Sequence, residues 1–143
     1  MQAEGKMNEC RSLRCVDEQL SPEERARYAR HLMLPEMGEE GQKKLKKSSV
    51  MVIGAGGLGS PTLLYLAAAG VGRIGIIDDD RVDITNLQRQ VIHATAAVGS
   101  LKVESAANRI RELNPEIEVV EHNIRLDVNN ALQLLTGWDV VID

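Results

Sequence analysis

Residues 50–59 read VMVIGAGGLG, and this stretch decides the fold. Its first four residues, Val50 to Ile53, form a continuous apolar run, which is typical of a strand buried on both faces of a parallel sheet. Glycines follow at once with the spacing Gly54-x-Gly56-x-x-Gly59, and the residues after them predict a helix over residues 58–69. A strand, a glycine turn and a helix in this order are the start of a nucleotide-binding βαβ unit, so the stretch predicts an α/β fold.

The glycine turn also predicts a binding site. Glycines allow the chain to turn tightly, and they let phosphate oxygens approach backbone N–H groups at the positive end of a helix. Gly54, Gly56 and Gly59 are therefore candidate nucleotide-binding residues. The alternative is a close strand-to-helix turn that binds no ligand.

Strands and helices alternate along the rest of the chain, which indicates right-handed crossovers and a parallel sheet. We therefore expect a Rossmann-like parallel sheet with flanking helices, preceded by two N-terminal helices. The helix over residues 58–69 is apolar nearly all round, so we expect it to be packed inside the molecule. The other predicted helices cover residues 21–33, 39–47, 102–113 and 128–135, and the other predicted strands cover residues 74–77, 117–121 and 139–142.

Residues 20–143 are predicted to form one nucleotide-binding domain. Residues 1–19 are polar and carry no periodic pattern, so they are interpreted as a flexible N-terminal extension. The chain stops on Asp143, at the tip of its last predicted strand, and we expect a truncated domain. Because a missing half would leave apolar faces uncovered, residues 1–143 alone are expected to be neither a competent enzyme nor very stable.

Composition excludes several classes of protein. The chain is 43% hydrophobic and 27% charged, as expected of a globular domain. Its net charge of −4 and the lack of a basic stripe argue against a nucleic-acid partner. The longest apolar stretch, Leu63 to Ala69, is far shorter than the roughly 20 residues of a membrane span. With no signal-peptide pattern and with Cys10 and Cys15 interpreted as free thiols, a reducing cytoplasm is expected.

Asp78 is the second candidate binding residue. It follows Gly59 by nineteen residues, at the end of the second predicted strand, where an acidic residue commonly binds a ribose. This position fits NAD and ATP equally well. A solvated acidic turn is the alternative for at least one of Asp78, Asp79 and Asp80, since three adjacent carboxylates repel one another.

The connection over residues 81–101 separates the two cofactors. It is longer than a nicotinamide dehydrogenase usually needs before its next helix, and long connections within compact domains are usually functional. It contains Arg89 and leads to Lys102. Two cations above a phosphate-binding turn suit a triphosphate, whose charge must be neutralised while pyrophosphate leaves. The alternative is that both are ordinary exposed basic residues.

A series of motifs occurs in one order along residues 20–143: GAGGLG at 54–59, GVG at 70–72, Asp78-x-Asp80, TNLQRQ at 85–90, Gly99-x-x-Lys102 and LNP at 113–115, preceded by RYARH at 27–31. This order resembles the MoeB/ThiF/E1-like family of adenylating enzymes. The resemblance implies a homodimer or pseudo-dimer that binds Mg-ATP, adenylates the C-terminal glycine of a ubiquitin-like sulfur carrier protein and releases pyrophosphate. The pathways open to it include molybdopterin and thiamine biosynthesis.

The resemblance also implies roles for single residues. Gly57 would lie against the nucleotide, Asp78 would hold its ribose, and Asp143 would hold Mg²⁺. Asp80 is a further candidate nucleotide-binding residue. Lys102 would contact the phosphates, and Arg30 would reach into the ATP site of a partner subunit. Arg89, Lys102 and Arg30 are thus the candidate catalytic residues. The phosphate site would be lined by Thr85, Asn86, Leu87, Gln88 and Arg89. Ser100-Leu101 departs from the family, which more often has a proline before this lysine.

Zinc and a reactive cysteine are not assigned to these 143 residues. In the family, the zinc-binding cysteine pairs and the catalytic cysteine lie beyond the point where this chain ends, and neither Cys10 nor Cys15 matches them. Two other functions compete with adenylation: an NAD-dependent oxidoreductase, and the inactive partner module of an activating enzyme. The presence of Arg89, Lys102 and Asp143 argues against an inactive site. The histidines, His31, His93 and His122, are interpreted as structural or solvated.

Overall fold

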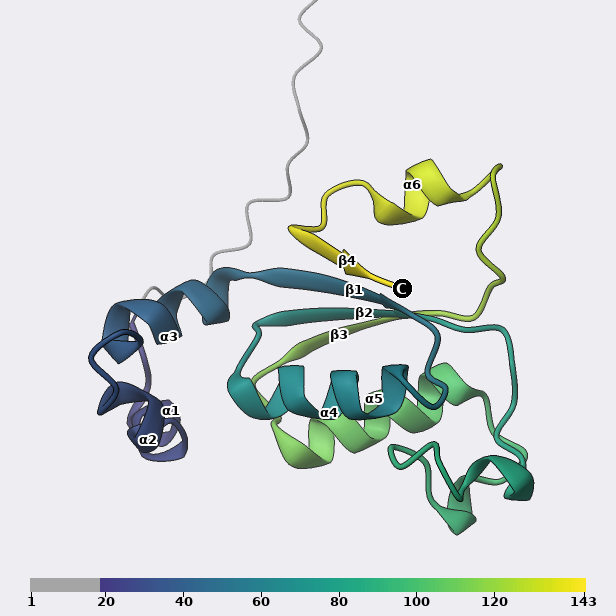
Figure 1. The fold of residues 1–143 in the computed structure, drawn as a ribbon, viewed down its shortest axis with the longest axis horizontal. Helices are drawn as coiled ribbons and strands as arrows, with labels where there is room; N and C mark the ends of the chain where they lie inside the picture. Colours follow the sequence, from purple (N-terminus) through teal and green to yellow (C-terminus); the bar gives the residue numbers. More distant parts are fainter. Residues whose placement is uncertain (1–18) are drawn as a thin grey trace, which may run out of the picture.

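Four parallel strands form the central sheet of the computed structural model, which describes residues 19–143 (Figure 1). Their order across the sheet is β3-β2-β1-β4, and the two middle strands, β1 and β2, are the most buried. The predicted Rossmann-like α/β fold is confirmed. The predicted flexible extension, with Cys10 and Cys15, lies outside the described residues except for Gln19. The strands are β1 (Ser49–Ile53), β2 (Arg73–Ile77), β3 (Glu118–His122) and β4 (Val140–Ile142).

One face of the sheet is covered by α4 (Gly59–Ala69) and α5 (Lys102–Leu113), and α6 (Ala131–Leu135) lies beyond the other face, next to β4 (Figure 1). Alternate residues of a strand point to opposite faces, so one set from β1 and β2 packs against α4 and α5. Within residues 19–143, no helix has the length and apolar character needed to cross a bilayer. The core formed in this way includes Val50, Val52, Ile74, Ile76, Leu63, Ala67, Ala107 and Ile110.

The α4 helix is less buried than its apolar sequence predicts. Leu63 and Ala67 are fully buried against the sheet, but Leu58 and Tyr65 are 88% and 77% exposed. The prediction that this helix is packed inside is therefore wrong for its outer side. The reason is that α4 and α5 form the outermost layer on this face of the sheet, so the far side of α4 faces solvent (Figure 1).

The first predicted helix is divided in two. The first part, α1 (Pro22–Arg27), begins after Ser21, whose Oγ accepts a hydrogen bond from the backbone N of Glu24 at 3.1 Å. The second part, α2 (Ala29–Leu32), follows Tyr28 at the break. The ring of Tyr28 is buried, and its hydroxyl accepts a hydrogen bond from Nδ2 of Asn114 at 2.8 Å. These contacts join the N-terminal helices to the end of α5.

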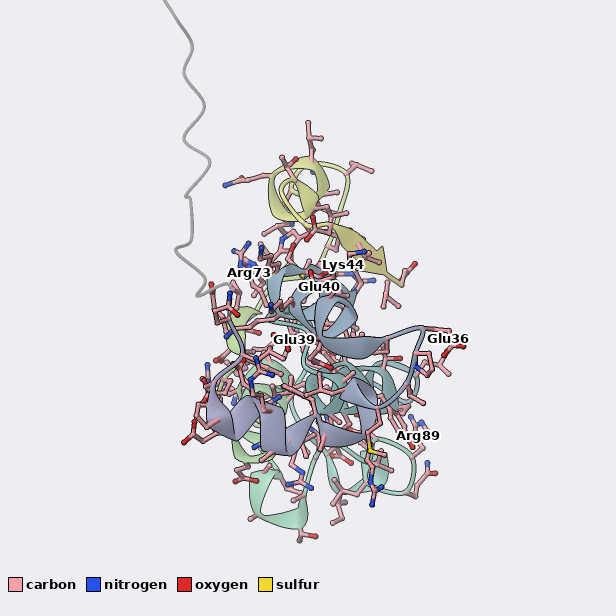
Figure 2. All side chains as sticks on the ribbon, turned by 90° about the vertical axis from the view of Figure 1, so that its left-hand side faces the viewer. Glu36, Glu39, Glu40, Lys44, Arg73 and Arg89 are labelled. Carbon is pink, nitrogen blue, oxygen red and sulfur yellow. The ribbon has the colours of Figure 1, made fainter. Side chains whose placement is uncertain are left out.

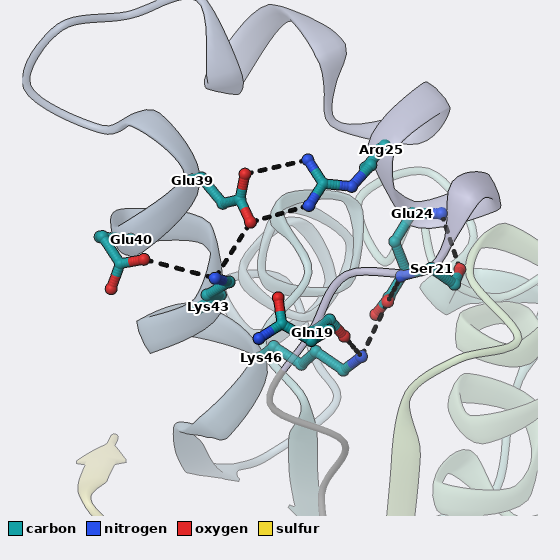
Figure 3. Close-up of polar contacts among 8 residues, drawn as sticks. All are labelled: Gln19, Ser21, Glu24, Arg25, Glu39, Glu40, Lys43 and Lys46. Atoms are coloured by element: carbon teal, nitrogen blue, oxygen red, sulfur yellow. Dashed lines mark hydrogen bonds and ion pairs between the residues drawn. The ribbon is translucent and has the colours of Figure 1, made fainter.

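Ion pairs hold α1 to α3 (Gly38–Lys47), as Figure 3 shows. Arg25 on α1 donates hydrogen bonds of 2.9 and 2.8 Å to the two carboxylate oxygens of Glu39, and Lys43 lies 3.0 Å from the same carboxylate. Lys46 lies 2.7 Å from the buried carboxylate of Glu24. Figure 2 shows the charged side chains that gather on and around α3. This group of helices lies where the strands begin, at the end of the sheet opposite the glycine turn (Figure 1).

Candidate nucleotide-binding site

The predicted binding residues gather at the carboxyl ends of the strands. Gly54 directly follows β1, and Asp78 directly follows β2. Ile142 of β4 aligns with Val52 of β1, so Asp143 leaves the sheet at this same edge. In open parallel sheets this is the edge at which ligands bind.

The glycine turn adopts a shape that only glycine permits at two positions. Gly54 has a φ of +91° and donates a 2.7 Å hydrogen bond to the carbonyl of Ile77, which joins the turn to β2. A Cβ on Gly59 would lie 1.9 Å from the carbonyl oxygen of Gly54. No side chain caps the start of α4, so the positive end of this helix faces the turn. This arrangement suits a phosphate group.

Arg89 and Gln90 lie over the glycine turn. A Cβ placed on Gly57 would lie 3.7 Å from Cδ of Arg89, and one placed on Gly56 would lie 3.8 Å from Nε2 of Gln90. Arg89 is exposed, and its guanidinium donates a 3.4 Å hydrogen bond to the carbonyl of Thr85. The fold thus brings a solvent-accessible cation from a distant part of the sequence to the turn.

The residues before Arg89 form a short 3₁₀ turn, η1 (Ile84–Asn86). The carboxylate of Asp83 accepts hydrogen bonds from Oγ1 and N of Thr85 at 2.6 and 2.8 Å, and these bonds lower its pKa. Oδ1 of Asn86 accepts a 2.9 Å hydrogen bond from N of Asp83. The side chains of Thr85 and Asn86 therefore shape the turn that places Arg89. The two remaining candidates of this stretch are half-buried Leu87 and exposed Gln88.

Asp78 joins the glycine turn to the residues after β2. Its Oδ2 accepts a 2.8 Å hydrogen bond from N of Ala55, and its Oδ1 accepts a 2.9 Å hydrogen bond from N of Asp80. A carboxylate oxygen can accept more than one hydrogen bond, so both oxygens keep capacity for ribose hydroxyls. Asp78 thus has a structural role in the turn that the sequence did not reveal.

Lys102 is a buried lysine at the start of α5. Its side chain is 7% exposed, and its Nζ lies 2.9 Å from Oδ2 of Asp80. The backbone N of Lys102 also donates a 3.0 Å hydrogen bond to the carbonyl of Asp80. The alternative that Lys102 is an ordinary exposed basic residue is therefore wrong. Arg89 is exposed, as the same alternative expected of it. A cation this buried needs an anionic partner, and Asp80 is that partner here.

A cavity of about 230 Å³ opens at the same edge, between the acidic turn and the segment that follows β3. It is smaller than the roughly 300–1,000 Å³ pockets that enclose whole drug-sized ligands, so it suits one end of a nucleotide. The segment after β3 was not among the sequence candidates. It carries no motif, and the one feature that could have indicated a binding site is its position directly after a predicted strand. The lining residues are Ile53, Gly54, Ile77, Asp78, Asp79, Asp80, Ile124, Arg125 and Leu126.

Two buried polar atoms near the turn have no hydrogen-bond partner within residues 19–143. They are Oγ of Ser60, in the first turn of α4, and Oε1 of Gln90. Both residues are almost fully buried, at 0% and 4% exposure. Because buried polar atoms are rarely left unpaired, these atoms mark a place where a polar ligand or water fits. Neither residue is among the candidates predicted from the sequence, although Gln90 closes the TNLQRQ motif.

The acidic groups at this edge have the chemistry that a magnesium ion requires. Asp78, Asp79 and Asp80 each offer one oxygen atom, all within 4.8 Å of one another. Carboxylates are the protein ligands that Mg²⁺ prefers, although Asp80 already pairs with Lys102. Asp143, to which the family resemblance assigns the metal, is exposed at the same edge. Residues 19–143 contain no cysteine, and so they offer no cysteine ligands for zinc.

Arg30 is not brought to this site. It is exposed on α2, which lies at the opposite end of the sheet from the glycine turn (Figure 1). Within the described part of the chain, the side chain of Arg30 makes no hydrogen bond or ion pair. Its side chain is therefore open to contacts outside its own subunit.

Two of the three histidines have clear structural contacts, as the sequence suggested. His31 stacks on Tyr28 with ring centroids 6.1 Å apart, and its Nδ1 lies 2.8 Å from Oε1 of Gln42. His93 is buried beside the glycine turn. His122 is half-buried at the end of β3.

Comparison with known proteins assigns the family. The sequence model of the ThiF family matches residues 28–143. This chain belongs to the ThiF family. It is 54% identical over 129 residues to the "Adenylyltransferase and sulfurtransferase MOCS3" of Aedes aegypti, covering 90% of this chain and 29% of the relative. It is 58% identical over 124 residues to the "Probable adenylyltransferase/sulfurtransferase MoeZ" of Mycobacterium tuberculosis, covering 87% and 32%. The chain thus spans about a third of the length of these relatives.

Solved structures show the same arrangement of strands and helices. The E. coli tRNA N6-threonylcarbamoyladenosine dehydratase TcdA, in complex with ATP, matches with a TM-score of 0.80 and 35% identity over 86% of this chain and 50% of that chain. E. coli MccB with AMPCPP and MccA matches with a TM-score of 0.71 and 32% identity, covering 80% and 35%. At least one protein with this ThiF-type fold therefore binds ATP.

Proposed function

We propose that this chain forms the ATP site of an adenylyltransferase that activates the C-terminal glycine carboxylate of a ubiquitin-like sulfur carrier protein. One observation carries the proposal: exposed Arg89 lies over the glycine turn, and buried Lys102 is fixed by Asp80 beside it. A dehydrogenase does not need two cations here, whereas a reaction that expels pyrophosphate does. The names of the two curated relatives and the ATP complex of TcdA support the same activity.

In the proposed reaction, a carboxylate oxygen of the carrier attacks the α-phosphorus of ATP. A new P–O bond forms to the carrier, the bond between the α-phosphorus and the bridging oxygen breaks, and pyrophosphate leaves with that electron pair. The carboxylate is already ionised at neutral pH, so no protein group has to remove a proton. The protein must align the two reactants and neutralise the charge that builds up on the phosphates.

Lys102 and Arg89 supply the positive charge that neutralises the phosphates, and they do so in different ways. Lys102 is fixed by burial and by the first turn of α5, so its ammonium is positioned before ATP binds. Arg89 is exposed and can move to follow the phosphates as they separate. We assign Mg²⁺ to Asp143 together with the carboxylates after β2, where the cation would neutralise the departing pyrophosphate.

Arg30 acts in trans in this proposal. Because α2 lies at the far end of the sheet, Arg30 of one subunit would contact the nucleotide of a second copy, which requires a homodimer. We also propose a cytoplasmic location, where ATP is available. A sulfur carrier protein is the favoured partner, because MOCS3 and MoeZ are named adenylyltransferases and sulfurtransferases.

The test is carrier-dependent exchange of labelled pyrophosphate into ATP, measured with the natural full-length protein. We expect exchange with an intact carrier and none with a matched carrier that lacks its terminal glycine. In parallel, ATP and NADH are titrated against the protein by calorimetry, and we expect binding of ATP alone. Tight NADH binding without exchange would replace this proposal by the oxidoreductase alternative.

A further inference from the structure

Hydrogen bonds form a closed circuit around the glycine turn. On one side, Asp78 accepts from N of Ala55, and on the other side the carbonyl of Ala55 lies 2.9 Å from Nε2 of His93. Nδ1 of His93 lies 2.8 Å from Oγ of Ser105 on α5. The same helix begins at Lys102, which pairs with Asp80 next to Asp78. The peptide of Ala55 is thus held through both its N–H and its C=O.

The partners of His93 fix its tautomer. A carbonyl oxygen can only accept, so Nε2 must carry the proton that is donated to Ala55. In the neutral ring Nδ1 then accepts, and the hydroxyl of Ser105 donates to it. Ser105 lies three residues after Lys102 and therefore on the same side of α5. His93 is 7% exposed, so water cannot readily replace either bond.

The charges around the ring favour this neutral form. Burial lowers the pKa of His93, and the nearby positive charge of Lys102 acts in the same direction. The bond to the Ala55 carbonyl and the charge of Asp78 act in the opposite direction and do not reverse the shift. At neutral pH the ring therefore donates once and accepts once, as its two partners require.

We propose that His93 is a positioning residue of the nucleotide site: it orients the Ala55 peptide and holds the glycine turn at a fixed place relative to the start of α5. The phosphate-binding N–H groups belong to the turn and the phosphate-binding ammonium belongs to α5. The side chain of His93 bonds directly to both elements, to Ala55 in the turn and to Ser105 on α5. This inference rests on the proposed function, because it names a residue that prepares the site for ATP.

The test compares three variants of the full-length protein with the wild type. His93→Ala removes both bonds, Ser105→Ala removes one of them, and His93→Gln keeps one donor and one acceptor in a side chain that does not titrate. We expect His93→Ala to raise KM for ATP about tenfold, with a smaller change in kcat, because losing an ordering contact of about 1.4 kcal/mol corresponds to a factor of ten. His93→Gln should restore KM to within about threefold of the wild type, and Ser105→Ala should lie in between.

Hydrogen exchange gives a readout that does not depend on ATP. We expect amides of residues 54–59 to exchange at least several-fold faster in His93→Ala and Ser105→Ala, and amides of residues 73–77 in β2 to be unchanged. The matched control is Ser49→Ala, which removes a 2.8 Å hydrogen bond from a buried serine to Asp139 where β1 begins, at the opposite end of the sheet from the glycine turn. It should lower Tm without changing KM for ATP or exchange in the turn.

Either of two results would overturn the inference: unchanged exchange of residues 54–59 in both His93→Ala and Ser105→Ala, or equal effects of His93→Ala and Ser49→Ala on KM for ATP. If His93→Ala does not fold, Ser105→Ala takes its place in both comparisons. A wild-type protein without ATP binding would refute the proposed function and remove the nucleotide role of His93. Faster hydrogen exchange of the turn amides in the variants would then show only that His93 orients the Ala55 peptide.

Discussion

Nζ of Lys102 lies 2.9 Å from Oδ2 of Asp80, yet the lysine side chain is 7% exposed and the aspartate side chain is 67% exposed. The cation is therefore fixed by the protein, while its anionic partner faces solvent. When a phosphate oxygen approaches, Asp80 can turn to water or to a cation, and Lys102 need not move. A preorganised phosphate-binding group has this property: the ammonium of Lys102 is already in place, so it does not have to rearrange during the reaction.

Replacing Lys102 by methionine should therefore separate activity from stability. We expect Lys102→Met to reduce carrier-dependent pyrophosphate exchange by about 10²–10³, the usual loss when one preorganised donor is removed. Tm should change by only a few degrees, because methionine fills the buried volume and Asp80 remains solvated. Lys44→Met, an exposed lysine on α3, is the matched control and should keep full exchange. Exchange within a few-fold of the wild type would remove Lys102 from the active site.

Replacing Arg89 by alanine should cause a similar loss of activity with even less effect on stability. Its side chain is exposed and contacts the Thr85 carbonyl at 3.4 Å, so Arg89→Ala removes little packing. We expect exchange to fall by about 10²–10³ and Tm to stay near the wild-type value. Arg109→Ala, another largely exposed arginine, serves as the control in the same two assays. A large fall in Tm with Arg89→Ala would mean that the residue supports the fold instead.

The glycine turn offers a matched pair of alanine variants. A Cβ on Gly59 would overlap the carbonyl of Gly54, whereas a Cβ on Gly57 meets only ordinary contacts with Arg89 at 3.7 Å. We expect Gly59→Ala to destabilise the protein by at least about 1–3 kcal/mol, the typical cost of overpacking. Gly57→Ala should unfold like the wild type but bind ATP more weakly, because its methyl group occupies space that a phosphate needs. Chemical denaturation and ATP titration of both variants measure these effects. Equal stabilities would contradict the geometry of the turn.

Local patterns were sufficient to predict the sheet and its main helices. The apolar run at residues 50–53 and the glycine turn after it are short-range features, and β1 and α4 follow them within one residue. The break at Tyr28 could not be predicted in this way. It coincides with a hydrogen bond to Asn114, a residue 86 positions away that the sequence does not pair with it.

The residues of the candidate site were predictable only where a local pattern places them. Gly54 and Asp78 lie at strand ends, so their meeting follows from a parallel sheet. The burial of Lys102 depends instead on how the connection over residues 81–101 folds back over the turn, which no local pattern encodes. The contacts of His93 follow no local pattern either, because its two partners, Ala55 and Ser105, are 38 and 12 residues distant in the sequence.

The trans role of Arg30 can be tested by mixing inactive subunits. Arg30 lies on α2 and Asp143 lies at the opposite end of the sheet, so a site shared between subunits would take these residues from different chains. We expect Arg30→Ala and Asp143→Ala homodimers to be inactive, and their mixture to regain exchange at one site per heterodimer. Differently tagged subunits purified in two steps show that heterodimers have formed. Heterodimers without any recovered activity would exclude a trans role for Arg30.

The ion pairs between α1 and α3 predict how stability depends on pH. Hydrogen bonds from Arg25 and then from Lys43 hold the pKa of Glu39 at about 2, well below its value of 4.5 in a free side chain (Figure 3). In the unfolded chain Glu39 therefore binds a proton at a higher pH than in the folded chain. Its contribution to stability is fully present above about pH 4.5 and is lost as the pH falls toward 2.

A comparison with Glu39→Gln isolates this contribution from that of other carboxylates. We expect the variant to have a lower Tm than the wild type at pH 6, and this difference to shrink steadily between pH 4.5 and pH 2.5. Because the pair is partly exposed, added salt should also reduce the difference at pH 6. Glu36→Gln is the control, since Glu36 is exposed on the connection before α3 and has no ion pair within residues 19–143 (Figure 2). Its effect on Tm should not vary with pH. A Tm difference for Glu39→Gln that stays constant from pH 6 to pH 2.5 would mean that these ion pairs do not hold α1 to α3 in solution.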